Sequence, residues 1–337
     1  SGESLNAAGS TKAMLLVSSN NGDVADYVQG GEKNDTIYAG SNDSVLGGAG
    51  NDTINLAADH ENVSIGIDTA SGHDTVAGFR GGFDSEADTL ALYDGTNLQS
   101  FGALSYDAAN GKVKMGNASL TLNGTSGSSN GSGVLDLKLL SAEGEHKVSV
   151  ITSKNGGTVS VADTDSYGDI FYGVKGKTNA VDLSNVSSDT VVAELGNYGL
   201  YDSGKLYFNI NKLYGSTTSS NILAGSGGND TIYAGSGVAN TIGGGAGNDV
   251  IIAGSGDDEH DTFVVGSAMG ADTVRGYNCD NDKVALTSGS IGQFSGVTRK
   301  GSNITFNFGG DSLTLALASS DSDLIEFGEV GDFGNLA

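Results

Sequence analysis

The 337-residue sequence contains no proline and no tryptophan, and its only cysteine is Cys279. A single cysteine excludes an intrachain disulfide and a metal site built from several thiolates. Glycine, by contrast, reaches 55 residues. Abundant glycine without proline predicts repeated tight turns that need a positive φ, joined by strands that keep every backbone N–H for pairing.

Long apolar runs and basic residues are also scarce. No stretch of about 18 apolar residues occurs, so we expect no transmembrane helix and no membrane insertion. Only 16 Lys and Arg residues accompany 41 Asp and Glu residues, and the formal net charge is −25. This balance argues against nucleic acid as a partner, because nucleic acid needs a basic surface. The acidity either keeps a secreted protein soluble or serves a bound cation, and the positions of the carboxylates decide between the two.

The carboxylates recur within a glycine-rich repeat. The sequence reads GGEKNDTIY at 30–38, GGAGNDTIN at 47–55 and GGAGNDVII at 244–252, with degenerate copies nearby. The shared pattern is G-G-x-G-x-D-x-U-x, in which U is a large aliphatic residue. It predicts the following inward-facing positions in the two blocks: Val28, Ile37, Val45, Ile54 and Val63, then Ile222, Ile232, Ile242 and Ile251.

One such nonapeptide forms a turn and a short strand, and it cannot bury its aliphatic residue alone. Two nonapeptides make one coil of about 18 residues, and stacked coils bury a core between two parallel sheets. Residues one coil apart should therefore lie above one another. Stacked carboxylates repel, so we expect between them a hard cation such as Ca²⁺, which takes roughly six to eight oxygen ligands. The pairs at this spacing are Asp35 with Asp52, Asp26 with Asp43, and Asp230 with Asp249.

The repeats, at about residues 22–64 and 215–265, resemble the RTX family, the hemolysin-type calcium-binding β-roll. The resemblance implies Ca²⁺ held between turns one coil apart, and export to a calcium-rich exterior, commonly by a type I route. Asp26 and Asp43 are further candidate ligands, whereas Lys33 and Asn240 replace a turn glycine and an aspartate and should weaken or abolish binding at their turns. The ligands that the resemblance implies are Asp35 with Asp52, Asp230 with Asp249, and carbonyls near Gly48, Gly50, Gly245 and Gly247.

Each block is followed by a similar tail. Residues 72–92 and 270–286 share a G-x-D-T-V-x-G-aromatic pattern, an acidic loop and a D-x-U-A-L strand, and SLTL recurs at 119–122 and 312–315. Residues from about 14 to 123 thus look duplicated as about 206 to 316. The resemblance to the RTX family implies that such tails form capping strands, which cover the last open coil. Asp74 and Asp272, in the tails, either bind a terminal calcium ion or cap a strand turn.

Residues 124–133, GTSGSSNGSG, are typical of a flexible linker. Beyond it, aliphatic residues recur at strand spacing without the glycine–aspartate turn, which fits an irregular solenoid or a β-sandwich. The sequence therefore predicts an all-β chain: a parallel β-roll or β-solenoid with two RTX blocks, each followed by capping strands, and a strand-rich middle section. We expect three parts, at residues 1–125, 126–205 and 206–337.

An enzyme would need a catalytic constellation. The cluster Asp257-Asp258-Glu259-His260-Asp261 could serve as an acid–base centre, but it lies where the next calcium turn belongs, which makes Asp258 a candidate ligand. The sequence has no G-x-S-x-G elbow, no P-loop lysine and no H-E-x-x-H helix. It therefore predicts a chain without catalytic activity.

Two classes of function fit these observations. The first is a calcium-binding structural or adhesive module at a bacterial cell surface, such as part of a surface layer or adhesin. Its partners would be calcium ions, other copies of itself, or a cell-surface glycan or protein. The second is a C-terminal secretion or stability module of a larger secreted enzyme of protease, lipase or epimerase type. Repetition without a catalytic constellation favours the first, whereas a catalytic domain elsewhere in the reading frame would indicate the second.

Overall fold

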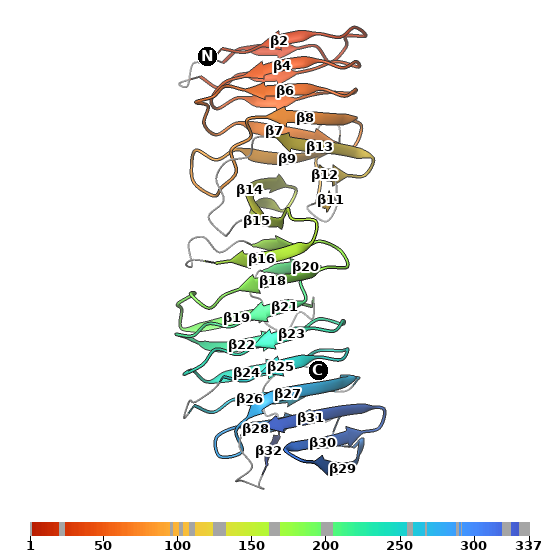
Figure 1. The fold of residues 1–337 in the computed structure, drawn as a ribbon. Helices are drawn as coiled ribbons and strands as arrows, with labels where there is room; N and C mark the ends of the chain where they lie inside the picture. The colour runs from red at the N-terminus through yellow and green to blue at the C-terminus, as the bar shows by residue number, and fades with distance from the viewer. Residues whose placement is uncertain are drawn as a thin grey trace. The chain divides into compact units, whose positions relative to one another are not determined.

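The fold was analysed in a computed structural model, in which the chain forms two compact units (Figure 1). Unit 1 comprises Ser1–Gly157 with Gly168–Val174, and unit 2 comprises Thr158–Tyr167 with Lys175–Ala337. The three-part division expected from the sequence stays a prediction, and residues 124–132 of the expected linker lie outside the described residues. The structure describes residues 2–19, 24–94, 97–100, 104–107, 112–123, 133–161, 169–196, 205–254, 259–266, 268–287, 290, 292–318 and 325–329.

Unit 1 contains two sheets, and successive strands of its coils alternate between them. Strands of neighbouring coils pair in parallel. The short strand β10 (Asn97–Leu98) pairs antiparallel with β9. The first sheet contains, in spatial order, β1 (Ser4–Asn6), β3 (Tyr27–Gln29), β5 (Ser44–Leu46), β7 (Ser64–Asp68), β9 (Thr89–Asp94), β14 (Val134–Ser141), β15 (Gly144–Ile151) and β17 (Ile170–Tyr172). The second contains β2 (Leu15–Val17), β4 (Thr36–Ala39), β6 (Thr53–Leu56), β8 (His73–Ala77), β13 (Ala118–Asn123), β12 (Lys112–Met115) and β11 (Leu104–Asp107).

Unit 2 repeats this arrangement, and Figure 1 shows its strands stacked one coil after another. The strand β20 (Leu206–Phe208) precedes its repeat block. One sheet contains β16 (Gly156–Ser160), β18 (Thr178–Asp182), β21 (Lys212–Tyr214), β23 (Thr231–Tyr233), β25 (Val250–Ile252), β27 (Ala271–Tyr277), β31 (Asp311–Leu317), β30 (Asn303–Phe308) and β29 (Phe294–Lys300). The other contains β19 (Thr190–Glu194), β22 (Ser220–Ala224), β24 (Asn240–Gly243), β26 (Thr262–Val265), β28 (Lys283–Leu286) and β32 (Glu326–Glu329).

The parallel register stacks aliphatic residues into columns inside each unit. In β4 and β6, Ile37 pairs with Ile54, and both side chains are fully buried. The other inward positions that the repeat predicts are buried as well, with one exception. Ile222 is only half-buried, because the register places Leu223 beside Ile242 and turns Leu223 inward instead. The prediction that Ile222 lies in the core was therefore wrong by one residue. A shift of one residue along a strand moves a side chain to the opposite face of the sheet.

Both repeat blocks end in the expected capping strands. In unit 1, β13 pairs in parallel with β8, and β12 and β11 then continue the sheet in the antiparallel sense. In unit 2, β31 pairs in parallel with β27, followed by the antiparallel strands β30 and β29. The all-β parallel β-roll predicted from the repeats is therefore confirmed.

The middle section continues the coils and does not form a separate sandwich. An antiparallel hairpin of β14 and β15 joins the first sheet of unit 1, and β17 then pairs in parallel with β15. In unit 2, β18 and β19 pair in parallel with β21 and β22. Of the two alternatives for this section, the structure shows the irregular solenoid. Among the described residues, no helix has the length and apolar character needed to cross a membrane.

Candidate calcium sites

The register brings three predicted ligands of unit 1 into a ladder along one row of turns. The backbone N–H of Asp35 donates to Oδ1 of Asp52 at 2.7 Å, and the N–H of Asp52 donates to Oδ1 of Asp74 at 2.9 Å. All three side chains are buried. Asp35 and Asp52 directly precede β4 and β6, and Asp74 is the second residue of β8, so the parallel pairing of these strands fixes the spacing of the carboxylates.

Unit 2 contains a matching ladder. The backbone N–H of Asp230 donates to Oδ1 of Asp249 at 2.7 Å, and the N–H of Asp249 donates to Oδ1 of Asp272 at 2.9 Å. These three residues are also buried. Asp74 and Asp272 therefore occupy the same place in their two ladders, one coil beyond the last glycine-rich turn.

The opposite row of turns in unit 1 holds Asp26 and Asp43, and there the chain itself binds both oxygens of each carboxylate. Asp43 Oδ1 accepts the N–H of Asp26 at 3.0 Å, and its Oδ2 accepts the N–H of Gly40 at 2.8 Å. Asp26 accepts the N–H of Glu3 at 2.7 Å and the hydroxyl of Ser19 at 2.8 Å, and these bonds lower its pKa. Both remain candidate ligands, but their negative charge is already stabilised by hydrogen bonds.

Three other predicted ligands have a buried oxygen that accepts no hydrogen bond. These oxygens are Asp52 Oδ2, Asp230 Oδ1 and Asp249 Oδ2. A buried carboxylate oxygen without a donor or a cation destabilises the fold, because the lost hydration is not replaced. The ladders therefore require a proton or a cation at these atoms.

Turn glycines lie directly beside the unpaired oxygens. A Cβ placed on Gly47 would lie 2.5 Å from Asp52 Oδ2. A Cβ placed on Gly244 would lie 2.6 Å from Asp249 Oδ2 and 3.0 Å from Asp272 Oδ2. The Oδ2 atoms of Asp249 and Asp272, on successive coils, thus converge beside Gly244.

Backbone carbonyls complete this oxygen-rich surrounding. A Cβ on Gly30 or on Gly225 would lie 1.9 Å from the carbonyl oxygen of Gly47 or of Gly244, respectively. In the part of the chain that the structure describes, no three His, Cys, Asp or Glu side chains gather in a group that could hold a metal ion. An ion at these turns would therefore depend on backbone carbonyls as well as carboxylates, a donor set that fits Ca²⁺ better than a transition metal.

The remaining predicted positions are turn glycines with a positive φ. The φ angles are +92° at Gly48, +125° at Gly50, +89° at Gly245 and +120° at Gly247. A Cβ on Gly245 would also lie only 2.2 Å from the carbonyl oxygen of Ser226 on the preceding coil. Both the left-handed backbone and the close approach of the next turn require glycine here. Asp258 lies outside the described residues.

The electrostatics of the ladders agree with their geometry. Burial, together with the charge of a neighbouring ladder carboxylate, raises the pKa of Asp52 and of Asp249 to about 7. Burial likewise raises the pKa of Asp74 to about 6 and that of Asp272 to about 8. The pKa of Asp230 is also raised by burial. Without a cation, the ladders favour bound protons.

Two further buried aspartates in the opposite rows of turns are not among the ligands that the repeat predicts. Asp88 Oδ1 accepts the N–H of Val63 at 2.9 Å, and Asp282 Oδ1 accepts the N–H of Asp261 at 3.1 Å. Both carboxylates are buried and lie in the acidic loops of the tails. The D-x-U triplets that begin at Asp88 and Asp282 are the signal that could have identified them.

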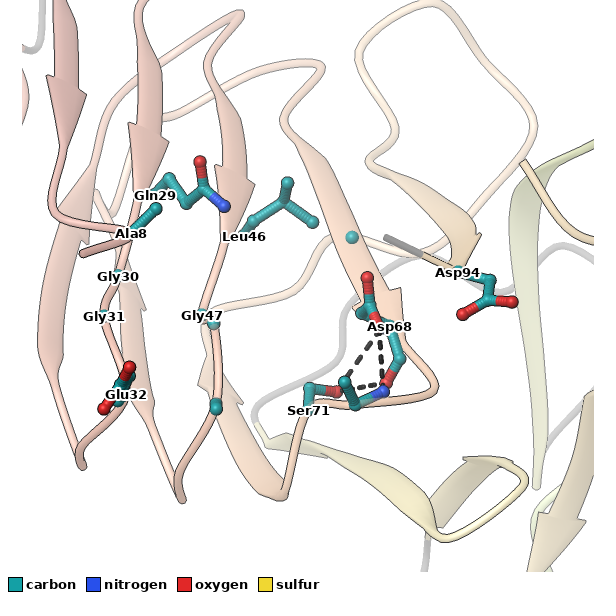
Figure 2. Close-up of a pocket in the computed structure, with 14 residues that line it drawn as sticks. Ala8, Gln29, Gly30, Gly31, Glu32, Leu46, Gly47, Asp68, Ser71 and Asp94 are labelled. Carbon is teal, nitrogen blue, oxygen red and sulfur yellow. Dashed lines mark hydrogen bonds between the residues drawn. The ribbon is translucent and has the colours of Figure 1, made fainter. Parts of the chain in front are cut away.

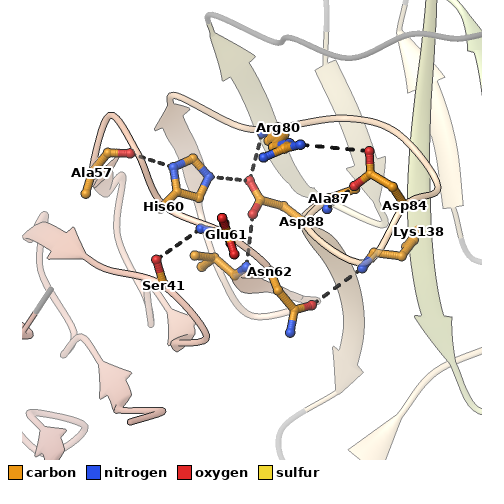
Figure 3. Close-up of polar contacts among 11 residues, drawn as sticks. Ser41, Ala57, His60, Glu61, Asn62, Arg80, Asp84, Ala87, Asp88 and Lys138 are labelled. Carbon is orange, nitrogen blue, oxygen red and sulfur yellow. Dashed lines mark hydrogen bonds and ion pairs between the residues drawn. The ribbon is translucent and has the colours of Figure 1, made fainter. Parts of the chain in front are cut away.

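Asp88 forms a buried ion pair with His60, shown in Figure 3. His60 Nε2 lies 2.9 Å from Asp88 Oδ2, and His60 Nδ1 lies 2.5 Å from the carbonyl oxygen of Ala57. Because both ring nitrogens face acceptors, the imidazole carries two protons and a positive charge. The hydrogen bond to Asp88 is the main cause that raises the pKa of His60. A protonated side chain thus neutralises this carboxylate.

A groove of about 420 Å³ runs beside the glycine pairs of unit 1, as Figure 2 shows. Gly30, Gly31, Gly47 and Gly48 form much of its wall, because they have no side chains to fill the space between turns. Asp68 lies at the same groove and its carbonyl accepts the Ser71 hydroxyl at 2.7 Å. The groove is a consequence of the glycine-rich turns.

The arrangement of aspartate ladders and positive-φ glycines has a counterpart among known families. A family model of the RTX calcium-binding nonapeptide repeat matches residues 21–56, 216–238 and 239–259, in four copies. The chain carries RTX calcium-binding nonapeptide repeats. The RTX repeats bind Ca²⁺, so calcium is the cofactor that this part of the chain takes.

Other comparisons add little to the family assignment. No curated protein matches the chain. Among solved structures, the extracellular lipase LipA from Serratia marcescens is similar, with 19% sequence identity and a TM-score of 0.23. The matched region covers 88% of this chain and 38% of the lipase chain, so the chain spans well under half the length of that protein.

Proposed function

We propose that the chain is a non-catalytic structural or adhesive module of a secreted protein at a bacterial cell surface, which calcium folds and stiffens. The observation that supports this most directly is the convergence of Asp249 Oδ2 and Asp272 Oδ2 beside Gly244. Two buried carboxylates on consecutive coils repel each other unless a proton or a cation lies between them, and calcium needs both of them ionised. Calcium therefore joins one coil to the next in this proposal.

Linkage between folding and calcium follows from the same geometry. The paired oxygens exist only when the coils are stacked, so calcium binds the folded chain in preference to the unfolded one. Ligand that binds only the folded state stabilises it by RT ln(1 + [L]/Kd). The low calcium of the cytosol would leave the repeat blocks unfolded for export, and calcium outside the cell would fold them.

Circular dichroism in chelator and then in excess calcium tests this coupling. We expect the strand signal of the full chain to rise on calcium addition, with an apparent midpoint that shifts when Asp249 is replaced. Asp189→Asn is the matched control, because Asp189 is exposed and lies outside the ladders. An unchanged spectrum in chelator and in calcium would contradict the proposal.

The module of a larger secreted enzyme is the second candidate, and the oligomeric state separates it from the first. A surface-layer or adhesive role predicts calcium-dependent assembly of purified chain into sheets or fibres, visible by electron microscopy and light scattering. A chain that stays monomeric at saturating calcium would favour the module of a secreted enzyme.

A further inference from the structure

Two consecutive turns in the second row of unit 2 contain asparagines, whereas the first row contains aspartates. The second row then continues with Asp261 and Asp282. Asn221 and Asn240 lie on consecutive coils, at the starts of the paired strands β22 and β24. Both are almost completely buried, with exposed fractions of 1% and 2%. Their positions match those of Asp230 and Asp249 in the opposite row, where a carboxylate oxygen is left without a hydrogen bond.

The side-chain amide of Asn240 is surrounded by oxygen atoms. Its Nδ2 lies 2.9 Å from the carbonyl oxygen of Gly235, 2.9 Å from that of Val238 and 2.8 Å from Oδ1 of Asp261. Two turn carbonyls and one carboxylate of the next coil therefore point at a single nitrogen. The amide must face them with its N–H groups, because the opposite orientation would place four oxygens together without a donor.

Asn221 repeats this arrangement one coil earlier. Its Nδ2 donates to the carbonyl oxygen of Ser216 at 2.9 Å and to Oδ1 of Asn240 at 2.6 Å. Its Oδ1 accepts the backbone N–H of Ser216 at 2.8 Å. The amides thus form a chain in which each N–H meets an acceptor of the turn or of the next coil.

The oxygens around Asn240 are of the kinds that surround a hard cation: turn carbonyls and a ladder carboxylate. An amide supplies the positive ends of two N–H dipoles in the same place and adds no negative charge. It therefore satisfies these oxygens without an ion, whereas the carboxylates of Asp249 and Asp272 need a proton or a cation between them.

We infer that the amide groups of Asn221 and Asn240 take the place of calcium at these two turns, so that the coils that they join need no ion there. The inference rests on the proposed calcium binding at the Asp249 row. The row of Asn221 and Asn240 would hold its coils together without calcium.

Replacing Asn240 with Asp tests the inference by creating a site. Asn240→Asp removes the N–H donors and adds a carboxylate facing Asp261, so we expect one additional calcium ion per chain by equilibrium dialysis with elemental analysis. We also expect the variant to need more calcium than the wild type to reach full strand content. Asn303→Asp adds the same charge at an exposed position and should leave the number of ions unchanged.

Asn240→Ala is the second control, because it removes the amide without supplying a carboxylate. It should lower the unfolding midpoint with and without calcium and leave the number of ions unchanged. If Asn240→Asp binds no more calcium than the wild type while Asp249→Ala loses an ion, the inference is overturned and the proposed function stands. A wild-type chain that binds no calcium would instead refute the proposed function.

Crystals of the wild-type chain grown in calcium provide a test that does not depend on a folded variant. Anomalous difference maps at long wavelength should show calcium beside Gly244 and none beside the Asn240 amide. A calcium peak within coordination distance of Asn240 Oδ1 would overturn the inference.

Discussion

The backbone N–H of Asp230 donates to Oδ1 of Asp249 at 2.7 Å, while Oδ2 of Asp249 accepts no hydrogen bond. One carboxylate therefore has two tasks: one oxygen joins it to the preceding coil, and the other is available to a cation. Substitutions that keep the hydrogen bond to Asp230 but change the free oxygen therefore separate the stability that calcium contributes from the stability that the hydrogen bond contributes.

Asp249→Ala and Asp249→Asn should have opposite effects on folding without calcium. Alanine removes both the acceptor for the N–H of Asp230 and the oxygen available to calcium. We expect the calcium concentration at half-maximal folding to rise about tenfold or more, since a contact to a charged group contributes roughly 1.5–3 kcal/mol. Asparagine keeps the acceptor for the N–H of Asp230 and adds N–H donors toward Asp272. We expect it to bind one calcium fewer and to be more stable than the wild type in chelator.

Calorimetric titration measures the number of bound calcium ions, and urea unfolding in chelator measures the stability of each variant. Equal loss of stability in both variants would show that the amide does not replace the ion.

Without calcium, the repeat blocks should become less stable as the pH rises. The pKa values of Asp52 and Asp249 are raised to about 7 and that of Asp272 to about 8, whereas an unfolded aspartate titrates near its ordinary pKa of 3.8. The folded chain therefore binds more protons than the unfolded chain between these pH values, and rising pH favours unfolding.

Calcium should reverse this trend, because calcium needs the ionised carboxylates and competes with protons for them. Urea unfolding at pH 5, 7 and 9 in chelator and in excess calcium measures both effects. We expect stability to fall with pH in chelator, and the stabilisation by calcium to grow over the same range. Apo stability that rises from pH 5 to pH 9 would contradict the assignment of raised pKa values.

His60 should stabilise unit 1 only while it is protonated. Its raised pKa means that this contribution is fully present below about pH 6.5, the ordinary pKa of histidine, and is lost as the pH rises through the pKa of the folded state. Removing one partner of a buried ion pair costs about 3–5 kcal/mol. In saturating calcium, thermal unfolding of His60→Gln should therefore differ most from the wild type at pH 6 and least at pH 9. A difference that is constant with pH would indicate a packing role alone.

Alanine at the turn glycines should separate backbone strain from steric clash. Gly237 has a φ of +76° and open space around a Cβ, whereas Gly245 has a φ of +89° and a carbonyl oxygen 2.2 Å from that position. We expect Gly237→Ala to cost about 1–2 kcal/mol through its left-handed backbone. Gly245→Ala should cost more and should also raise the calcium midpoint, because the turn must shift. Equal effects of the two substitutions on stability would show that the neighbouring coil does not constrain the turn.

Period and composition were enough to predict the coil, the columns of aliphatic residues and the caps. A repeat of two nonapeptides fixes which residues stack, so the positions of Asp52 over Asp35 and of Asp249 over Asp230 follow from spacing alone. At Ile222 the spacing predicts the wrong inward residue, because Asn221 takes the aspartate position there and Leu223 is the side chain that turns inward.

The repeat pattern could not predict the hydrogen bonds that distinguish one turn from the next. Asn240 departs visibly from the repeat, but its acceptors come from Gly235, Val238 and Asp261, which only the folded turn brings together. The pairing of His60 with Asp88 likewise joins two loops on different coils. Spacing predicts which residues stack, whereas the atoms that neutralise each carboxylate depend on the conformation of the loops.

The antiparallel strands after each repeat block also interrupt the parallel stack in one sheet of each unit. A parallel stack offers the same edge after every coil, so nothing in the repeat itself limits how many coils can be added. In β12 and β30 the chain runs in the opposite direction to β13 and β31, so the edge beyond these strands differs from the edge that every coil of the repeat presents. In this sheet the repeat therefore does not present its own edge to a further nonapeptide, whereas the other sheet of unit 1 continues in parallel from β9 to β14.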